Sequence, residues 1–504
     1  MAISWALFLL YVVGTLWLAR LGQKKTTTFE SYALGDGAMH PFVAGMALAA
    51  SMTSTATLVI NPGIVYAYGL SAVLGYGLSA GVGLAVGIVA FSKAFRRRGA
   101  EARILTVPQW IGRRWNDERM TLFYAAVNLL LIAMVVMICY AMAGLLLATL
   151  GLEGLVPGWG FEVALAAIVL FVFAYVFVGG TFAHAYTNTL QGVLMLIVAA
   201  ILVGSGAHLF DGHLLERLAT IDPALATAVH PGSLLFRNLF EVFGANLLIG
   251  VALSLQPHFL VKALYVKSER DVDRYLAIAI GAGVLFNLVL LCGLYARVER
   301  SAEVLAFMKQ SGLGIDGVMP AYIVSTFPPL LQSFVSVAIL AAGMSTLDGI
   351  LVALSAIFAN DVVLVLRRRR GHRDAAGDAA LAFRVGRYSL VGLGVVAFAI
   401  ALQQHGAKKL SIAIFAQEGV YALLVATFVP LLFGLFGRGL AKGWVVASSI
   451  VALVVHFGFR YGGVSLLTTN DGANPGLTAA YALFASLAVA LVGRAVAGAS
   501  PPEA

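Results

Sequence analysis

The chain has 504 residues, of which 61% are hydrophobic and only 11% are charged, and its mean hydropathy is +0.93. Because a soluble globular protein carries roughly 25% charged residues, this composition argues against a soluble enzyme or binding domain and predicts a polytopic helical membrane protein. The formal net charge of +9 raises the question of a nucleic-acid partner, which the placement of the basic residues answers below.

Apolar segments of about 20 residues, the length that crosses a bilayer, recur along the whole chain. We predict thirteen transmembrane helices, which fall at 3–20, 41–69, 71–94, 119–149, 162–180, 187–207, 236–258, 275–297, 321–361, 385–404, 410–436, 442–460 and 476–494. The first of them is interpreted as a retained helix and not as a signal peptide, because no basic region precedes it. The glycine-rich helix at 71–94 is interpreted as one that packs closely against a neighbour.

The basic residues follow the topology that these helices define. With the amino terminus outside and the carboxyl terminus in the cytoplasm, 25 of the 33 lysines and arginines fall in inward segments and 8 in outward ones. Such a bias is the positive-inside rule of membrane proteins. The charge therefore reports orientation in the membrane, argues against nucleic-acid binding, and places every lysine and arginine in a loop or at a helix end.

The segment 41–69 differs from a plain lipid-facing helix. Its centre carries five hydroxyl side chains, Ser51, Thr53, Ser54, Thr55 and Thr57, and Asn61-Pro62-Gly63 follows them. Helix-breaking sequence persists at membrane depth only where it faces protein or a watery cavity. We therefore predict a broken helix, whose freed carbonyls and helix ends bind an ion or a polar solute. The alternative is that the hydroxyls bond to their own helix or pack against a neighbour.

A second interrupted segment lies five spans later, at 236–258, where Gln256-Pro257-His258 ends an apolar run. The two segments have opposite orientation and stand at matching positions of two halves. This arrangement predicts an inverted repeat with a binding site between the two breaks. The predicted boundaries of the single transport domain are 41–207 and 236–436 for the two five-helix repeats, with 3–20 and 442–494 as additional helices.

The third polar group lies in the segment 321–361, which contains AILAAGMSTLDGILVALSAIFAND. Ser345, Thr346 and Asp348 fall within one helical turn at its middle. A carboxylate at membrane depth marks a functional site by default, and hydroxyl oxygens are the hard donors that a small alkali cation needs. Hydroxyl pairs alone are weak evidence, because helix packing also produces them.

Together these residues resemble the sodium:solute symporters, a family that includes bacterial proline and pantothenate permeases and sodium/sugar cotransporters. Four stretches match in order: SYALGDGAMHPFVAGMALAASMTSTATLVINPGIVYAYG, VGGTFAHAYTNTLQG, LQPHFLVKALYVKSERD and AAGMSTLDGILVALSAIFANDVV. The resemblance extends over about residues 30–440. The basic residue that follows QPH favours the branch of the proline and pantothenate permeases over the sugar branch.

The resemblance implies a LeuT-type fold, with a ten-helix core built from the inverted repeat. It also implies one sodium ion between the first and eighth core helices. By motif, the sodium ligands would be the carbonyl oxygens of Ala50, Thr53 and Ala342 and the hydroxyl oxygens of Ser345 and Thr346. Five oxygens without a formal charge suit a weakly held monovalent cation, which must also leave.

Two positions depart from the pattern of the family. Many relatives carry aspartate where Asn188 stands, and the proline permeases carry aspartate where Met52 stands. Both departures remove negative charge near the expected cation path and put tight sodium coupling in question. Asp348, three residues after Ser345 and on nearly the same helix face, would restore one charge.

The solute is less sharply defined by the sequence. Since every lysine and arginine was placed in a loop or at a helix end, a monocarboxylate or a zwitterion fits better than a multiply charged anion. One carboxylate would be held by N–H groups at the start of the outer half-helix. The candidate solute-binding residues are Ser51, Met52, Ser54, Thr55, Gln256 and Glu418. Glu418 would meet an ammonium group, or else reach water from the outer third of its helix.

The sequence thus predicts a sodium-coupled secondary transporter of a small organic solute, which works by alternating access and is not an enzyme. Its partners would be sodium, the solute and the lipid bilayer of the plasma membrane, with no further cofactor and with the monomer as the working unit. One alternative is a proton-coupled carrier in which Asp348 or Glu418 titrates. The other is a membrane sensor that does not transport.

Overall fold

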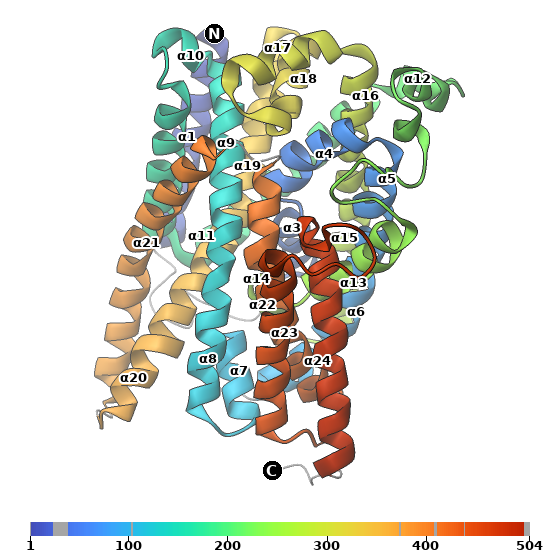
Figure 1. Ribbon diagram of the computed structural model, residues 1–504. Helices are drawn as coiled ribbons and strands as arrows, with labels where there is room; N and C mark the ends of the chain where they lie inside the picture. The colour runs from blue at the N-terminus through green and yellow to red at the C-terminus, as the bar shows by residue number, and fades with distance from the viewer. Residues whose placement is uncertain are drawn as a thin grey trace.

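The computed structural model describes residues 2–23, 39–101, 104–371, 374–407, 411–437 and 439–497. Within these ranges, the side chains of 2–4, 18–19, 21–23, 99–101, 175, 178–187, 375–376 and 497 are outside the description. The start of the first family-like stretch, at 31–38, therefore lies outside it. Within the described ranges all regular structure is helical, and the helices pack along one another (Figure 1). This confirms the predicted all-α class.

Nine stretches of the described residues are helices long and apolar enough to cross a membrane, and two bent helix pairs raise the number to eleven. The first is Leu70–Arg98, which consists of α5 (Leu70–Ala72), η2 (Val73–Ser79) and most of α6 (Ala80–Glu101). The second is Glu118–Leu150, which consists of α8 (Glu118–Asn128), η3 (Leu129–Leu131) and α9 (Ile132–Leu150). The third is Asn188–Leu209, which consists of the end of α11 (Gly160–Gly204) and η4 (Ala207–Leu209). The nine continue with Glu269–Glu299 (α15, Glu269–Leu288; η8, Val289–Leu291; α16, Cys292–Glu299), Pro329–Arg369 (α19, Pro329–Ala356; η10, Ile357–Val363; α20, Leu364–Arg369) and Gly377–Gly406 (in α21, Ala375–Gly406). The last three are α22 (Ile412–Leu435), α23 (Lys442–Gly462) and Pro475–Val496 (in α24, Pro475–Ala497).

Two shorter apolar segments fall on the remaining predicted spans. They are Trp5–Trp17 in α1 (Ala2–Gln23) and Gly160–Ala174 in α11. Every predicted span therefore overlaps an apolar helical segment, while the number of actual membrane crossings stays a prediction. The shorter connecting helices are α7 (Val107–Arg114), α10 (Leu152–Leu155), α12 (Leu214–Ile221), η5 (Pro223–Ala226) and α17 (Ser301–Ser311).

The first bent pair is α3 (Pro41–Met52) followed by η1 (Ala56–Ile60) and α4 (Asn61–Tyr68), with a bend of 49°. The break falls inside the cluster of hydroxyl residues: Thr53 has φ −102° and ψ 81°, and the hydroxyl of Ser54 accepts the N–H of Ala56. The predicted broken helix is confirmed, and its break lies at the hydroxyl cluster and not at Asn61-Pro62-Gly63. The chain passes through this tripeptide as a helix, because a π-helical turn precedes the proline and accommodates its missing N–H.

The second bent pair is η6 (Phe240–Ala245) with α13 (Asn246–Leu253), followed by α14 (Pro257–Leu260) and η7 (Val261–Tyr265), and its bend is 56°. Gln256 is the residue before Pro257 and has φ −57° and ψ 132°. A residue before proline is disfavoured in the helical region, whereas proline itself suits the first turn of a helix. The predicted break at Gln256-Pro257 is confirmed.

The predicted span 321–361 is wrong at its start. Its first residues belong to a separate helix, α18 (Val318–Thr326), and the long helix α19 begins only at Pro329. Phe327 and Pro328 between them are extended, with ψ angles of 144° and 155°. Two consecutive prolines explain this, since each disfavours the helical conformation of the residue before it.

Close packing explains the glycines of the segment 71–94. A Cβ on Gly83 of α6 would lie 2.3 Å from the carbonyl oxygen of Leu247, and a Cβ on Gly250 of α13 would lie 2.3 Å from that of Ala80. Glycine at both positions lets the two backbones approach directly. The interpretation of this segment as a closely packed helix is confirmed, and the contact joins the second broken segment to α6.

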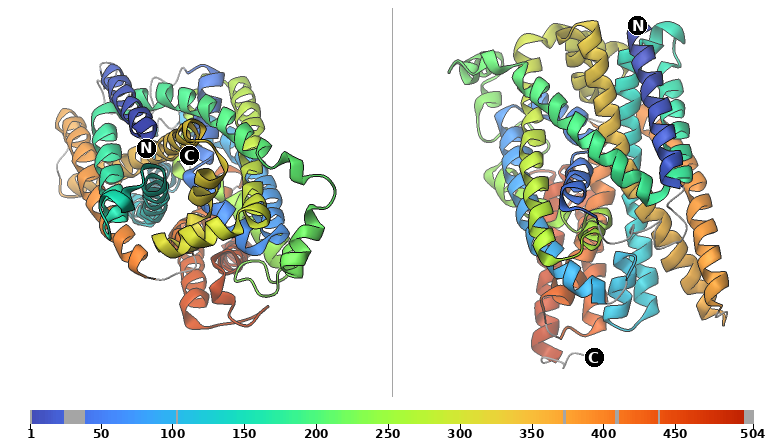
Figure 2. Two further views of the ribbon diagram at one scale, coloured as in Figure 1. Left: turned by 90° about the horizontal axis from the view of Figure 1, so that it is seen from above. Right: turned by 180° about the vertical axis from the view of Figure 1, so that it is seen from behind.

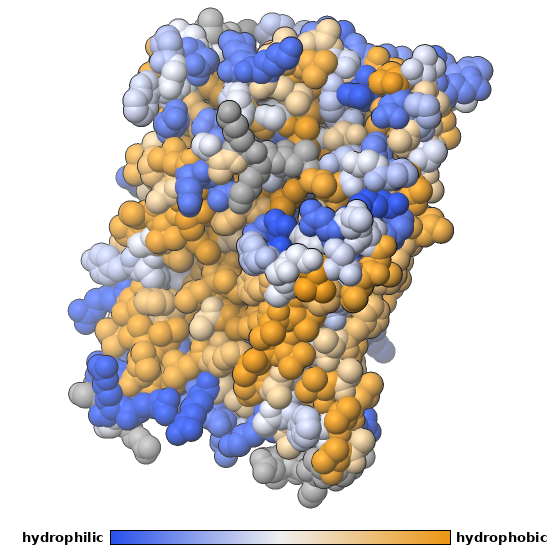
Figure 3. All heavy atoms as spheres, in the orientation of Figure 1, coloured by the Kyte–Doolittle hydropathy of each residue, from blue (hydrophilic) through white to orange (hydrophobic). Residues whose placement is uncertain are grey.

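The surface of the bundle agrees with a membrane protein. α1 begins at one end of the bundle and α24 ends at the other (Figures 1 and 2). Hydrophobic side chains cover much of the middle and lower part of the flank that Figure 3 shows, and hydrophilic ones gather at its upper end and at its lower edge, where α20 ends in Arg367, Arg368 and Arg369. Because α1 begins and α24 ends at opposite ends of the bundle, the chain should cross the membrane an odd number of times. Which end of the bundle faces the cytoplasm stays a prediction.

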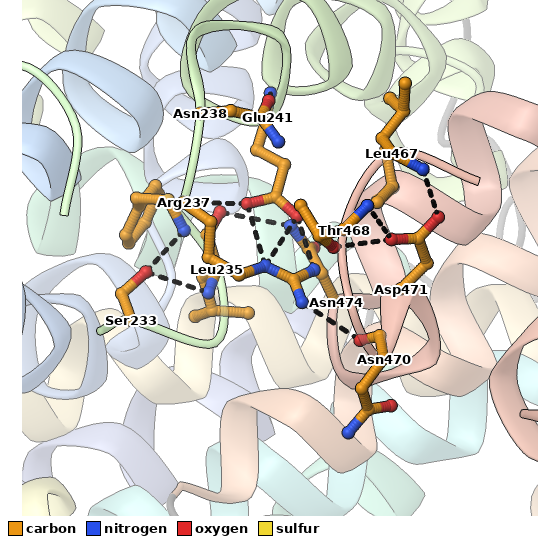
Figure 4. A network of polar contacts seen from close by, with 12 residues as sticks. Ser233, Leu235, Arg237, Asn238, Glu241, Leu467, Thr468, Asn470, Asp471 and Asn474 are labelled. Carbon is orange, nitrogen blue, oxygen red and sulfur yellow. Dashed lines mark hydrogen bonds and ion pairs between the residues drawn. The ribbon is translucent and has the colours of Figure 1, made fainter. Parts of the chain in front are cut away.

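The two carboxy-terminal helices are joined to the second broken segment by a polar network (Figure 4). Arg237 precedes η6 and pairs with Glu241, whose side chain is fully buried. The same guanidinium donates hydrogen bonds to the carbonyl oxygens of Thr469 and Asn470, 3.1 and 3.0 Å away, in the loop between α23 and α24. The additional helices are therefore anchored to the core by buried charge as well as by apolar packing.

Candidate functional site

The candidate cation site lies where the end of α3 packs against the middle of α19. The hydroxyl of Ser345 lies 3.1 Å from the carbonyl oxygen of Ala50 and 2.8 Å from that of Ala342. The hydroxyl of Thr346 lies 3.3 Å from the oxygen of Ala50. All four residues are fully buried. The fold thus brings four of the five predicted sodium ligands together from two helices that are far apart in the sequence.

The break in α3 explains why the carbonyl oxygen of Ala50 is available. The last carbonyls of a helix have no N–H partner within it, and α3 ends at Met52. Thr53, the fifth predicted ligand, is 2% exposed and forms the break itself, with its N–H bonded to Ala49. Unwound carbonyls together with facing hydroxyls form a set of neutral oxygen donors of the kind that coordinates sodium in transporters. The donor chemistry therefore fits a monovalent cation.

Asn188, one of the two departures from the family pattern, lies beside this site. It comes from α11 and is fully buried. Its side-chain amide donates to the backbone oxygen of Ser345 at 3.4 Å. Asn188 therefore contacts the turn of α19 that carries Ser345 and Thr346. This agrees with the expectation that position 188 lies near the cation path.

The additional helix α1 also reaches this region, which the sequence did not suggest. α1 packs along α11 and α19 (Figure 2, right). The hydroxyl of Tyr11 accepts a hydrogen bond from the amide of Gln191 and donates one to the sulfur of Met344, the residue before Ser345. The amino-terminal helix therefore supports the turn of α19 that carries the candidate ligands.

A buried lysine and a buried aspartate lie next to the candidate sodium site, and the lysine contradicts the predicted location of the basic residues. Lys262 is only 1% exposed, and its ammonium donates to the carbonyl oxygen of Ala47 at 3.0 Å and to the hydroxyl of Ser51 at 2.6 Å. Asp348 on α19 is 1% exposed and interacts electrostatically with the same ammonium. The expectation that every lysine lies in a loop or at a helix end, with none buried, is wrong.

The bend after Gln256 is the reason for this error. It turns α14 and η7 back into the protein, where α14 packs against α3 and α19, so Lys262 points at α3 and not at the cytoplasm. A single lysine inside the apolar run HFLVKALYV was the available signal. The count of basic residues per loop could not detect it, because that count treats the end of the apolar segment as the membrane surface.

The candidate solute-binding residues separate into two groups. Thr55 and Gln256 lie at the two breaks, and each has a buried side-chain oxygen without a hydrogen-bond partner among the described residues. Buried polar atoms in this condition are rare and require an explanation. Ser51 and Ser54, in contrast, are engaged by Lys262 and by the backbone of Ala56.

The other two candidates point elsewhere. The end of the Met52 side chain lies beside Gly283 of α15. The carboxylate of Glu418 accepts hydrogen bonds from Arg460 and from the hydroxyl of Tyr461, both on α23. Because an arginine already neutralises Glu418, it is poorly placed to hold the ammonium group of a solute.

The chain is similar to known membrane transporters in sequence and in structure. The model of the sodium:solute symporter family matches residues 32–450. A sodium/pantothenate symporter of Haemophilus influenzae is 27% identical over 71% of this chain and 71% of its own. A sodium/proline symporter of Staphylococcus saprophyticus is also 27% identical, over 90% of this chain and 85% of its own.

Solved structures with the same fold are more distant in sequence. One is a substrate-bound, outward-open Na+-coupled sialic acid symporter, with a TM-score of 0.76, 18% identity and 99% of both chains covered. Another is Mhp1, a nucleobase-cation-symport-1 family transporter, with a TM-score of 0.53, 15% identity, and 90% of this chain and 93% of its own covered. At these identities the comparison establishes the arrangement of helices, which is the LeuT type.

Proposed function

Because the chain belongs to the sodium:solute symporter family, we propose that it couples sodium entry to the uptake of a small monocarboxylate or amino-acid-like solute by alternating access, as a monomer. It is a multi-pass protein of the plasma membrane. Sodium-coupled symport follows from the family and from the named relatives. The solute class, the residues that bind it and the working unit are our proposal.

The observation that supports this function best is the set of neutral oxygens between α3 and α19. Ser345 and Thr346 face the carbonyl oxygen of Ala50 within 3.3 Å, and the break at Thr53 completes the set. Because these oxygen ligands carry no formal charge, the site binds a small cation weakly enough for sodium to leave again on the inner side. Release of the ion is as necessary for a carrier as its binding.

The proposed solute position lies between the two breaks. Thr55 Oγ1 and Gln256 Oε1 are the buried oxygens that a solute would satisfy with its own donors. The charge of Lys262 is balanced by Asp348, so it supplies no net positive charge to a multiply charged anion. A solute with one carboxylate, or a zwitterion, therefore remains the best match.

Uptake into proteoliposomes tests this proposal. Purified protein should accumulate one of a panel of labelled solutes (proline, pantothenate, lactate, a sialic acid) when an inward sodium gradient is imposed. Choline in place of sodium should abolish the accumulation. Uptake that follows an imposed pH gradient and ignores sodium would replace sodium with the proton as coupling ion. If none of the panel accumulates under either gradient, the proposed solute class is wrong.

A further inference from the structure

Lys262 holds a position in which a metal cation would be expected. Its ammonium donates hydrogen bonds to the carbonyl oxygen of Ala47 and the hydroxyl of Ser51, and it interacts electrostatically with the carboxylate of Asp348. A carbonyl, a hydroxyl and a carboxylate are the oxygen donors that bind hard metal cations in proteins. The lysine ammonium is itself a compact, monovalent point charge. Lys262 therefore binds the carbonyl and the hydroxyl directly and balances the charge of the carboxylate, as a bound alkali cation would.

The two cation positions are neighbours. Ser51, which accepts from the ammonium, directly follows Ala50, whose carbonyl oxygen belongs to the candidate sodium site. Asp348 stands two residues after Thr346 on α19. We propose that the ammonium of Lys262 occupies a second monovalent-cation site beside the sodium site. The protein therefore binds one sodium ion from solution, while the Lys262 side chain supplies the second cation. The inference rests on the proposed function.

The charges of this region support a single mobile ion. Asp348 and Lys262 together are neutral, and the oxygens of the sodium site carry no formal charge. One sodium ion therefore adds a single positive charge, whereas a second ion beside the ammonium would meet strong repulsion at low dielectric. Without the lysine side chain, the carboxylate of Asp348 would be buried and uncompensated, a condition that strongly favours the binding of a cation.

A small cavity also lies next to the second site. A cavity with room for roughly one water molecule lies beside Lys262, between η7 and the later turns of α19. His258 and Thr106 also line it. Truncation of Lys262 would extend this cavity to Ser51 and Asp348, so an ion from solution could occupy the space that the ammonium leaves.

Equilibrium binding of radioactive sodium to the purified protein tests the inference without knowledge of the solute. The wild-type protein should bind about one sodium ion per chain, and Lys262→Ala should bind roughly twice as much at saturation, because the freed carboxylate recruits a second ion. Ethylammonium, which resembles the missing side chain, should displace the second ion from Lys262→Ala and leave the first in place. Lys267→Ala is the matched control, since Lys267 is exposed on the same segment and its loss should change nothing.

Several results would overturn the inference. Two sodium ions bound by the wild-type protein would do so, as would an unchanged single ion in Lys262→Ala. The double variant Lys262→Ala/Asp348→Asn should return to one ion, and two ions in it would show that Asp348 does not hold the second. A Lys262→Ala protein that fails to reach the membrane should be restored by growth with ethylammonium or high sodium, and absence of this rescue also counts against the proposal.

The experiments distinguish a failure of the proposed function from a failure of this inference. A wild-type protein that binds one sodium ion and accumulates no solute under a sodium gradient would leave the two cation positions intact and refute the symport. Sodium-driven uptake by a protein that binds two sodium ions would support the symport and refute the role of Lys262.

Discussion

At the scale of single residues, the hydroxyl of Thr346 distinguishes an ion ligand from a packing group. Thr346→Ala removes one of five oxygens from the proposed sodium site, and the loss of one such contact, worth about 1.4 kcal/mol, weakens sodium binding roughly tenfold. We expect the sodium concentration for half-maximal uptake to rise by this factor, while the amount of protein in the membrane stays the same.

Thr427→Ala serves as the control for this prediction. Thr427 is equally buried, and its hydroxyl bonds to the carbonyl oxygens of its own helix α22. Its removal should leave the sodium dependence unchanged. If Thr346→Ala also leaves it unchanged, the hydroxyl pair has only a packing role.

The balance of charge around the site leads to a prediction about Asp348. Asp348→Asn would leave the ammonium of Lys262 as an uncompensated positive charge beside the sodium site, and sodium activation should weaken by more than about tenfold. Adding Asn188→Asp should recover part of the activation, because position 188 touches Ser345 and returns a negative charge from α11. Sodium-dependent uptake by the two single variants and the double variant measures this.

Two outcomes would contradict the idea that Asp348 replaces the acidic group missing at Asn188. In the first, sodium-dependent uptake by Asp348→Asn/Asn188→Asp is no higher than uptake by Asp348→Asn alone. The charge at position 348 would then act only through Lys262. Alternatively, Asp348→Asn could abolish only the pH dependence of uptake, and the proton-coupled mechanism would then gain support.

At the scale of elements, the start of α22 depends on a buried carboxylate in η9 (Gly314–Gly317). Asp316 accepts hydrogen bonds from the hydroxyl of Ser411, the residue before α22, and from the N–H of Ile412, its first residue. Burial raises the pKa of the Asp316 carboxyl from 3.8 to about 7, although these two hydrogen bonds oppose the rise. The folded protein therefore holds this proton more tightly than the unfolded chain does.

The raised pKa predicts a loss of stability with rising pH. The contribution of Asp316 is complete below pH about 4 and disappears as the pH rises through about 7, with an upper limit of roughly 4 kcal/mol. The melting temperature should thus fall between pH 5 and pH 8.5, and Asp316→Asn should flatten this fall. Asp211→Asn is the control, because Asp211 is exposed and its pKa is lowered by the N–H of His213. An equal slope in wild type and Asp316→Asn would refute the assignment.

For the whole molecule, the distribution of basic residues, 24 in inward segments and 8 in outward ones once the buried Lys262 is left out, predicts the orientation of the bundle. A reporter fused after Arg367 should be cytoplasmic, and one fused near His213 should be external. These positions lie at opposite ends of the described bundle, at the end of α20 and the start of α12 (Figure 1). Alkaline phosphatase and green fluorescent protein fusions measure the two sides, and reporters that agree on one side would exclude the thirteen-helix topology.

The positions of the apolar helices, both broken segments and the hydroxyl pair of α19 could be predicted from the amino-acid sequence alone. These features are local: the bilayer requires about 20 apolar residues per crossing, and it tolerates a break only where polar groups find partners inside the protein. The two prolines at 328 and 329 carried a local signal as well, although the predicted span ran through them.

Only the tertiary structure decided which charged groups meet. Lys262 could extend toward the cytoplasm or into the protein, because its long side chain places the charge several bonds from the backbone, and the bend at Gln256 selects the interior. Glu418 is neutralised by Arg460, and Asp316 caps α22, through contacts between residues far apart in the chain. Such pairings depend on how helices are placed in three dimensions, which neither periodicity nor spacing along the sequence specifies.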